Sequence, residues 1–437
     1  MANENNNTDS QIIGQKIYSL IEKLYPICRS ITGNGVRETL KILQEYIPLE
    51  IKEIPTGTKV FDWTVPKEWN ITNAYVKNSQ GKKIIDFQKS NLHVISYSTP
   101  INQKMNLQEL QPHLHTLPKH PDWIPYLTSY YKENWGFCLT HNQYKELTED
   151  IYEVVIDSSL AEGSLTYGEL FLPGDSSEEI LFTCYICHPS LCNDNLSGTA
   201  ILTFLAQELQ QKKRHKSYRF LFLVETIGAI TWLALNQEKI QHIKAGLVAV
   251  DLGDSGPMTY KKKKVNPTLI NQVVEQVLSE TNKPHTILEF SPLGSDERQF
   301  CSPGINLNIG SLMRSHYEVY PQYHTSADNL SFMNQNALTE SLNIFREITF
   351  ILEHNQTFQN TNPHCEPQLG RRGVYSHIGG QKERNIDTKA LFWLLNYSDG
   401  NHTLLDISCL SKIPFRKIND AAEILLQTKL LQPQVQK

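Results

Sequence analysis

Two hydrophobic periods alternate along the middle of the chain. Continuous apolar runs, too short for ordinary helices, predict buried strands at 180–187, 218–225 and 245–251. Apolar residues at helical spacing predict helices at 198–212, 229–241, near 267–280 and near 335–355. Shorter strands are expected near 286–290 and 305–309. This alternation predicts an α/β fold with a mostly parallel sheet and helices on both faces.

The segments on either side of this alternation have other patterns. After a polar tail, two amphipathic helices joined by a Gly-Asn-Gly turn are expected. Short β-type runs broken by Pro, Asn and Gly then predict a β-rich inserted subdomain, with runs at 83–88, 92–98, 152–157 and 168–174. Three helical segments after a Gly-rich stretch predict a C-terminal winged helix. The expected domains are an α/β domain, the insertion and the winged helix, at 12–50 with 173–360, 51–172 and 361–437.

The bulk composition excludes several classes of protein. Hydrophobic residues make up 40% and charged residues 20% of the chain, as in an ordinary globular protein. A net charge of -5 argues against a dedicated nucleic-acid or anionic-membrane binder. No apolar run is long enough to cross a membrane, and the polar start is not a signal peptide. We therefore expect a cytoplasmic protein whose eight cysteines are reduced.

The loop after the first apolar run carries the first candidate chemistry. His188 ends this run, and Asp194 lies in the polar turn before Ser197 and Gly198 open the next helix. The carboxyl edge of an open α/β sheet is where ligands bind, so these two side chains can converge there on one point. A divalent metal is the commonest reason for such a pairing.

Other interpretations of this loop remain open. Asp194 can cap the following helix, and a lone histidine at a strand end is often structural. Residues 184–188 match the C-x-x-C-H pattern of haem attachment, although a buried strand does not offer the accessible, exported segment that attachment needs. Cys192 extends the pattern to C-x-x-C-x4-C, but no second zinc knuckle follows.

Three further titratable residues fall at or after the ends of predicted strands. Glu225 and Asp251 end two apolar runs, and His324 follows the last strand region. Solvated acids normally decorate helix faces, whereas these end apolar segments. Together with His188 and Asp194 they make five groups that the strands can deliver to one edge of the sheet.

The chemistry of these groups suggests their roles. Zinc binds imidazole nitrogen and carboxylate oxygen, so His188, Asp194, Asp251 and His324 are the candidate ligands. Asp194 can bridge two ions through its two oxygens. Glu225 is the candidate general base for a metal-bound water, whose pKa falls to about 7. Alternatively, Glu225 lies favourably at a helix N-terminus, and Asp251 is an ordinary capping residue.

A cluster of tyrosines and one arginine are candidates for contacts with the substrate. Tyr317, Tyr320 and Tyr323 cluster before His324, and one of them, for which we select Tyr323, can donate a hydrogen bond to an oxyanion. Arg298 can bind a substrate carboxylate through two parallel hydrogen bonds. The alternatives are packing roles for the tyrosines and an isolated surface position for the arginine.

Taken together, these motifs resemble the zinc aminopeptidases of the bacterial leucyl aminopeptidase type. The resemblance rests on combined short motifs: His188, Asp194-Asn195-x-Ser197-Gly198, Glu225-x-x-Gly228, Asp251, Ser295-Asp296 and Tyr323-His324-Thr325-x-x-Asp328. More narrowly, LYPICRSITGNGVRETL, HPSLCNDNLSG, GSDERQFCSPG and YHTSADNL resemble a bacterial branch with a β-rich insertion, a winged helix and an association with polysaccharide biosynthesis. The resemblance spans nearly the whole chain. We expect Asp296 and Arg298 to be the substrate-binding residues.

The chain departs from this family at the catalytic turn. The family has two adjacent glutamates, a base and a zinc ligand, where this chain has Glu225 and Thr226. The resemblance therefore implies Glu225 as the base and leaves one metal position short of a ligand, so one zinc ion or two remain open. The family's His-x-Asp spacing is also absent, because Pro189 and Ser190 follow His188.

We expect a zinc-dependent aminopeptidase-like hydrolase that acts on a peptide or an amide-linked small molecule. Three alternatives remain: a catalytically silent binding module, a regulatory protein that uses the winged helix, and a cysteine hydrolase built on Cys187 or Cys192. The third winged-helix segment has few basic residues, so we expect a protein partner or a second copy of the chain there rather than nucleic acid.

Overall fold

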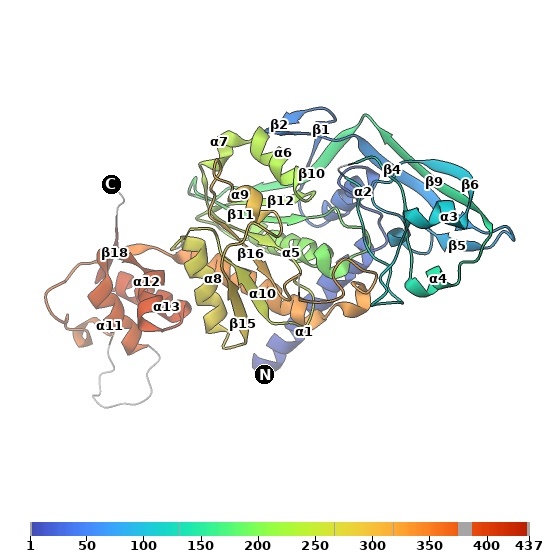
Figure 1. Ribbon diagram of the computed structural model, residues 1–437. Coiled ribbons are helices and arrows are strands. Elements are labelled where there is room, and N and C mark those ends of the chain that lie inside the picture. Colours follow the sequence, from blue (N-terminus) through green and yellow to red (C-terminus); the bar gives the residue numbers. More distant parts are fainter. Residues whose placement is uncertain (1, 131, 266, 318, 375–386, 435–437) are drawn as a thin grey trace. The chain divides into compact units, whose positions relative to one another are not determined.

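The computed structural model describes residues 2–130, 132–265, 267–317, 319–374 and 387–434 (Figure 1). Two compact units divide the chain. The first consists of Met1–Ile270 with Pro284–Asn343, and the second of Asn271–Lys283 with Ile344–Lys437.

The first unit is built on a mixed sheet. Among the described residues its strand order is β1-β10-β12-β11-β13-β16-β14-β15. Its four central strands are mutually parallel: β12 (Ser217–Leu223), β11 (Glu179–Tyr185), β13 (Ile243–Ala249) and β16 (Ile309–Met313). The antiparallel pairings involve the outer strands β1 (Glu50–Pro55), β10 (Ser164–Leu172) and β14 (Met258–Lys261), and β15 (His285–Leu288) runs parallel to β14. The prediction of a mostly parallel sheet is confirmed for this central part.

Helices cover both faces of the sheet. Cys184 of β11 contacts Thr199 of α5 (Gly198–Gln210), whereas Arg219 of β12 lies over the ring of Trp232 in α6 (Ile227–Leu235). Arg219 is the register neighbour of Leu181, and Leu181 and Cys184 point to opposite faces because they are three residues apart on one strand. The helices α5 and α6 therefore lie on opposite sides of β11 and β12, as predicted.

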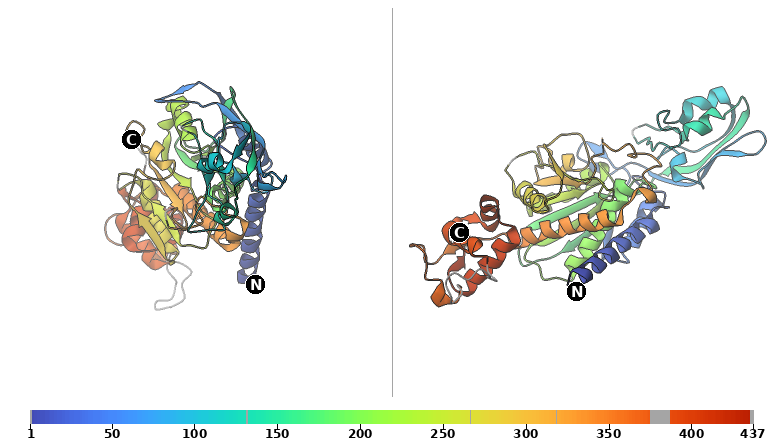
Figure 2. Two further views of the ribbon diagram at one scale, coloured as in Figure 1. Left: turned by 45° about the vertical axis from the view of Figure 1, so that its right-hand side comes forward. Right: turned by 90° about the horizontal axis from the view of Figure 1, so that it is seen from below.

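Two N-terminal helices complete the first unit's helical layer. The helix α1 (Ala2–Leu24) packs against α5, and Figure 2 shows it beside the start of α10 (Gln335–His354). It begins earlier than the predicted amphipathic segment. The helix α2 (Asn34–Leu43) starts after Gly33, whose φ is 98° and whose added Cβ would lie 2.1 Å from the Trp69 carbonyl oxygen. Only glycine fits this turn.

The predicted insertion forms its own sheet between β1 and β10. Its strand order is β5-β4-β9-β6, with bounds Lys83–Asp86, Glu68–Lys77, Ile151–Ala161 and Ile101–Asn106, and all pairings are antiparallel. Smaller elements surround it: β2 (Lys59–Val60), β3 (Trp63–Thr64), β7 (Leu114–His115), β8 (Phe137–Cys138), α3 (Leu107–Leu110) and α4 (His141–Lys145). Buried Phe137 and Tyr152 belong to a hydrophobic core of this part, so much of its aromatic content is structural.

The second unit contains the C-terminal winged helix. A three-stranded sheet, β18-β17-β19, accompanies three helices. The elements are β17 (Thr357–Asn360), α11 (Thr388–Tyr397), β18 (Asp399–Thr403), α12 (Leu404–Ser411), α13 (Phe415–Gln427) and β19 (Leu431–Pro433). Part of the predicted Gly-rich linker, 375–386, lies outside the described residues. Basic residues of α13 are paired, since Arg416 forms two 2.8 Å hydrogen bonds with Glu347 and Lys417 lies 3.6 Å from Asp387.

Several predicted elements were misplaced. The run 92–98 is not a strand: it holds a short 3-10 turn, isolated bridges and Tyr97 at a φ of 74°. The strand expected at 305–309 begins only at Ile309, because Asn306 adopts a φ of 51°. The strand β14 was missed, since its four residues are too few to show a period. The helix expected at 229–241 ends at Leu235, and α7 (Gln237–Ile240) follows.

The other predicted elements occur close to their expected positions. The helix α8 spans Leu269–Glu280, and α9, which was not predicted, spans Glu297–Phe300. The run 168–174 contributes to β10 of the main sheet rather than to the insertion's sheet. The exact domain boundaries stay a prediction. Within the described residues, no helix combines the length and apolar character needed to cross a membrane.

A buried ion network joins three strands of the sheet. Arg219 of β12 pairs with Glu169 of β10 and with Glu179 of β11, where Nε lies 2.7 Å from Oε2. All three side chains are at most 7% exposed. We expect Arg219→Ala to lower the free energy of unfolding by about 3–5 kcal/mol, because Glu179 would stay buried without its cation. Thermal and denaturant unfolding would measure this change.

The matched control is Lys52→Ala, which removes the exposed pair between Lys52 and Glu50. Its cost should stay below about 1 kcal/mol, since solvent screens such pairs. Equal effects of the two substitutions would contradict a stabilising role for the buried network.

Candidate metal centre

The ends of the parallel strands bring the predicted residues to one edge. His188 lies three residues beyond β11, Glu225 two beyond β12 and Asp251 two beyond β13. The turn Cys192–Ser197 then leads into α5 at Gly198. An added Cβ at Gly198 would lie 2.5 Å from the Ala249 carbonyl oxygen, so glycine lets this loop press against the end of β13.

A buried arginine fixes the backbone at His188. Arg29 is fully buried, and its Nε donates to the His188 carbonyl oxygen at 2.9 Å while Nη1 donates to the Leu24 carbonyl at 2.7 Å. Burial lowers the pKa of Arg29 to about 10, so it remains a cation at neutral pH. Arg29 therefore has a structural role at this loop.

Three of the predicted metal ligands converge. Asp194 Oδ2 lies 3.0 Å from His324 Nε2 and 3.8 Å from His188 Nε2. One ligand atom from each residue lies within 4.8 Å of the other two, and the imidazole centroids are 5.3 Å apart. His324, which lies more than a hundred residues further along the chain, therefore faces the same point as His188 and Asp194. A coordinated ion requires this geometry.

The group of His188, Asp194 and His324 contains buried polar atoms without hydrogen-bond partners, which favours a bound cation. Asp194 is fully buried, and its Oδ1 accepts from the Tyr185 hydroxyl at 2.5 Å. Asp194 Oδ2 and His324 Nε2 are buried and make no hydrogen bond, although they are only 3.0 Å apart. Buried lone pairs without donors are costly, and a divalent ion such as zinc would satisfy both.

The charge states also suit metal binding. Burial alone would raise the pKa of Asp194, but His188, His324 and the Tyr185 hydroxyl together hold it at about 2. Burial lowers the pKa of His188 to about 4. Asp194 is therefore ionised and His188 is neutral at physiological pH, which are the forms that bind a metal.

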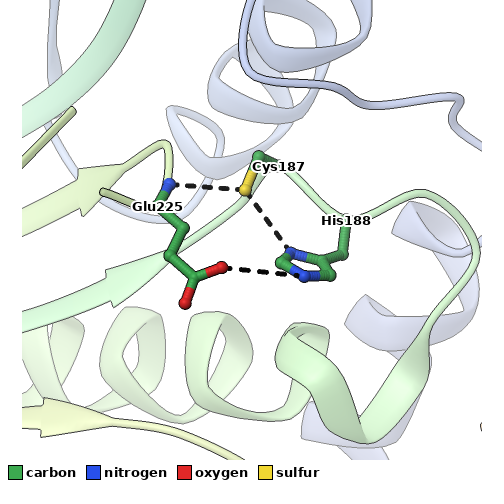
Figure 3. Close-up of side chains that lie close together, drawn as sticks. All are labelled: Cys187, His188 and Glu225. Carbon is green, nitrogen blue, oxygen red and sulfur yellow. Dashed lines mark hydrogen bonds and ion pairs between the residues drawn. The ribbon is translucent and has the colours of Figure 1, made fainter. Parts of the chain in front are cut away.

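The Glu225 side chain faces His188. Its Oε2 is 3.8 Å from His188 Nε2, and its backbone N–H donates to Cys187 Sγ at 3.3 Å (Figure 3). Burial, followed by repulsion from Asp296 and Asp194, raises the pKa of Glu225 well above its ordinary value. A nearby dication would oppose this shift, because it stabilises the carboxylate form.

Asp251 approaches the cluster without joining it. Its Oδ1 accepts from the Tyr320 hydroxyl at 3.0 Å, and its Oδ2 is buried without a hydrogen-bond partner. Burial and the neighbouring Asp194 raise the pKa of Asp251 well above its usual range. Of the described residues, only His188, Asp194 and His324 form the tight ligand group around this point, so the ligand role of Asp251 stays a prediction.

Strained backbone marks three of these positions. Thr226, Asp251 and His324 have φ values of 62°, 47° and 54°. Residues with side chains rarely adopt this region, and a β-branched residue such as Thr226 is an outlier there. Strain of this kind persists only where surrounding contacts determine the backbone, as at functional sites.

The predicted substrate-binding residues brace the turn beside Glu225. Asp296 Oδ1 accepts from the Thr226 N–H at 2.7 Å, and Arg298 Nη2 donates to Thr226 Oγ1 at 3.2 Å. Asp296 Oδ2 and Arg298 Nε are buried without hydrogen-bond partners. Burial raises the pKa of Asp296 to about 7. Arg298 is not an isolated surface residue, but substrate binding by this pair stays a prediction.

Tyr323 stacks on the metal-facing imidazole. Its ring lies 3.9 Å from that of His324 at 15° between the planes, and the rings of Tyr317 and Tyr320 lie 5.9 and 5.8 Å from it. Burial, then the charge of Asp194, raises the pKa of Tyr323, so its hydroxyl keeps the proton. The predicted oxyanion contact stays a prediction.

Asp328, which had no predicted role, positions Asp194. The Asp328 carboxylate is fully buried and accepts the backbone N–H groups of Asn193 at 2.6 Å and Asp194 at 2.9 Å. Its place in the His324-Thr325-x-x-Asp328 motif was the available signal. Only folding shows that it binds a loop 134 residues away.

The insertion also reaches the metal centre. The Tyr126 ring lies 5.1 Å from both imidazoles, those of His188 and His324. Backbone hydrogen bonds hold it there: Tyr126 N–H donates to the His324 carbonyl at 2.8 Å, and Ser326 N–H donates to the Ile124 carbonyl at 2.8 Å. Since Tyr126 is only 4% exposed, the insertion supplies one wall of the site.

Two family models match this chain. Residues 18–355 match the family model described as a domain of unknown function, DUF4910, and residues 356–433 match a winged helix-turn-helix model. The chain belongs to the DUF4910 family. A Clostridium acetobutylicum relative, 56% identical over 97% of each chain, has a name that refers to polysaccharide biosynthesis and an aminopeptidase-like domain.

Solved structures show the same fold. A crystal structure from Clostridium acetobutylicum, whose title refers to a peptidase, shares 55% identity over 98% of this chain and 99% of its own, with a TM-score of 0.94. A zinc aminopeptidase from Bacillus subtilis gives a TM-score of 0.57 at 10% identity, covering 78% of this chain and 94% of its own. A peptidase M28 precursor from Shewanella amazonensis gives 0.54 at 12% identity, with 80% and 97% covered. The α/β unit of this DUF4910 protein therefore has an aminopeptidase-like fold.

The contacts of Asp328 generate a prediction. We expect Asp328→Ala to weaken zinc binding by about 10–100-fold, because residues that orient metal ligands typically contribute this much. Asp328→Asn, which retains one acceptor oxygen, should have an intermediate effect. Zinc titration against a competing chelator would measure both.

The control is Asp122→Ala, which removes an exposed carboxylate bonded only to Asn142 among the described residues. It should leave zinc binding unchanged, and melting curves would show whether each variant is folded. Wild-type zinc affinity in a folded Asp328→Ala variant would refute the positioning role.

Proposed function

We propose that this DUF4910 protein is a zinc-dependent aminopeptidase-like hydrolase. The observation that carries the proposal is the convergence of Asp194 with the imidazoles of His188 and His324 at the carboxyl edge of the sheet. The fold shared with zinc aminopeptidases supports it. A carboxylate that faces the ligand His188, as that of Glu225 does, also supplies the group that proton transfer in hydrolysis requires.

Each residue around the ion would have a separate role in amide hydrolysis. When bound, zinc would supply a Lewis acid and acidify a water molecule. Glu225 would accept the water proton at its carboxylate and return it to the leaving amine. The Tyr323 hydroxyl would donate a hydrogen bond to the oxyanion, since it stacks beside His324.

We propose that one ion is held tightly by His188, Asp194 and His324. Thr226 offers no carboxylate, and its hydroxyl accepts from Arg298. Asp251 is a further candidate ligand, because its Oδ2 has no hydrogen-bond partner. A second ion therefore needs ligands other than Thr226.

The walls of the site suggest a small substrate with one amide bond to cleave. Tyr126 closes one side of the metal centre. Arg298 and Asp296 lie beside Glu225 and retain unpaired polar atoms, so they can orient a substrate carboxylate or amine. We propose a short peptide or an amide-linked small molecule, and N-acylated sugars are one amide-linked class to assay.

Removal of either imidazole tests the metal centre. We expect His188→Ala and His324→Ala each to weaken zinc binding by more than about 100-fold, since each removes a direct ligand. Metal analysis after dialysis would measure the loss. His285→Ala changes an exposed histidine on β15 and should retain zinc. Undiminished zinc in both site variants would refute the assignment.

Replacement of the proposed base tests the reaction. We expect Glu225→Gln to reduce hydrolysis of aminoacyl amides, short peptides or N-acylated sugars by about 10²–10⁴-fold, because the amide cannot accept the proton. Tightly bound zinc should remain in this variant. Glu289→Gln, at an exposed position paired with Lys262, is the control. Equal activity of Glu225→Gln and wild type on a cleaved substrate would refute the role of Glu225.

For the C-terminal unit we propose a protein partner rather than nucleic acid. DNA binding depends on free basic side chains that release counterions, whereas Arg416 and Lys417 pair with carboxylates. We expect the full chain to show no salt-dependent binding to duplex DNA in a fluorescence anisotropy titration. Binding that weakens steeply with salt would refute this proposal.

A further inference from the structure

A cysteine and a carboxylate flank His188 next to the three-ligand group. Cys187 Sγ lies 3.4 Å from His188 Nδ1, and Glu225 Oε2 lies 3.8 Å from His188 Nε2. Figure 3 shows the three side chains turned toward one another, with the sulfur next to one ring nitrogen and the carboxylate next to the other. One ligand atom from each residue lies within 4.8 Å of the other two.

These donors form a set that binds metal ions. Thiolate sulfur, imidazole nitrogen and carboxylate oxygen are the three donor types found in zinc sites, and sulfur adds preference for thiophilic ions. Cys187 and His188 are buried, whereas the Glu225 side chain is 29% exposed. An ion can therefore reach the group from the Glu225 side, and a water molecule can complete its coordination.

The donors are not committed elsewhere. Cys187 is a free thiol, and its sulfur contacts only His188 Nδ1 at 3.4 Å and the Glu225 backbone N–H at 3.3 Å among the described residues. In the same part of the chain, no N–H or O–H group donates to the Glu225 carboxylate, whose nearest basic group is His188. Cys184 differs, since it contacts Thr199 and faces α5.

We propose that Cys187, His188 and Glu225 form a second metal position, selective for thiophilic divalent ions, that shares His188 with the first. On binding, a metal–sulfur bond forms and the S–H bond breaks, with the proton released to solvent. No electron is transferred. This position differs from the group of His188, Asp194 and His324 in two of its three ligands, the Cys187 sulfur and the Glu225 carboxylate.

The second position would regulate the reaction of the first. This consequence rests on the proposed function, in which Glu225 is the general base. An ion bound to Glu225 withdraws that carboxylate from proton transfer, so zinc in excess of the tightly bound equivalent would inhibit hydrolysis. The Cys187 thiolate would supply a donor atom that the Thr226 side chain lacks.

The experiment is a cobalt titration of the metal-free full chain. Cobalt replaces zinc, and a cobalt–thiolate bond gives a charge-transfer absorption in the near ultraviolet. We expect this absorption to grow with a second equivalent of cobalt. It should disappear in Cys187→Ser, which still binds the first equivalent through His188, Asp194 and His324. Glu225→Gln should weaken the second equivalent by about tenfold or more.

The matched control is Cys184→Ser, which replaces another buried thiol on the preceding strand. It should retain the absorption, and melting curves would confirm that both serine variants are folded. Absence of thiolate absorption at saturating cobalt in the wild type, or its persistence in Cys187→Ser, would overturn the proposal. These results do not depend on turnover, so failure to find a substrate would count against the proposed hydrolase and not against this site.

Discussion

The site depends on the burial of one ionised carboxylate. Asp194 has no exposed surface, yet its neighbours hold its pKa at about 2. Tyr185 and Asp328 fix its side chain and backbone, and the two imidazoles of His188 and His324 face its free oxygen. A buried charge of this kind is tolerated only when polar groups or an ion compensate it. The surrounding loops are arranged to supply that compensation.

The pKa values of the acidic residues at the carboxyl edge of the sheet also favour a bound cation. Burial raises the pKa values of Glu225 and Asp251 well above normal, and those of Asp296 and Asp328 to about 7. Such a surplus of acidic groups is costly without a cation nearby. A bound dication would reverse the local balance and let more of these groups ionise. The same acids would therefore act as ligands, base and positioning residues once an ion is present.

The turn at Thr226 holds the proposed base in place. Its backbone is strained, and Asp296 and Arg298 contact it through hydrogen bonds. The neighbouring carboxylate of Glu225 faces His188. Thr226 offers no carboxylate, whereas Cys187 presents a sulfur donor atom 3.4 Å from His188 Nδ1. The turn thus combines a carboxylate suited to general-base chemistry with a thiol that can bind a metal ion.

The sequence alone determined the α/β class, the central strands and the strand-end positions of His188, Glu225 and Asp251, because buried parallel strands are continuous apolar runs whose ends share one edge. It could not locate β14, which is too short to show a period. Only the tertiary structure decided that Asp328 and Tyr126 reach the centre. Contacts between distant loops depend on backbone turns and packing, which leave no periodic signal in the chain.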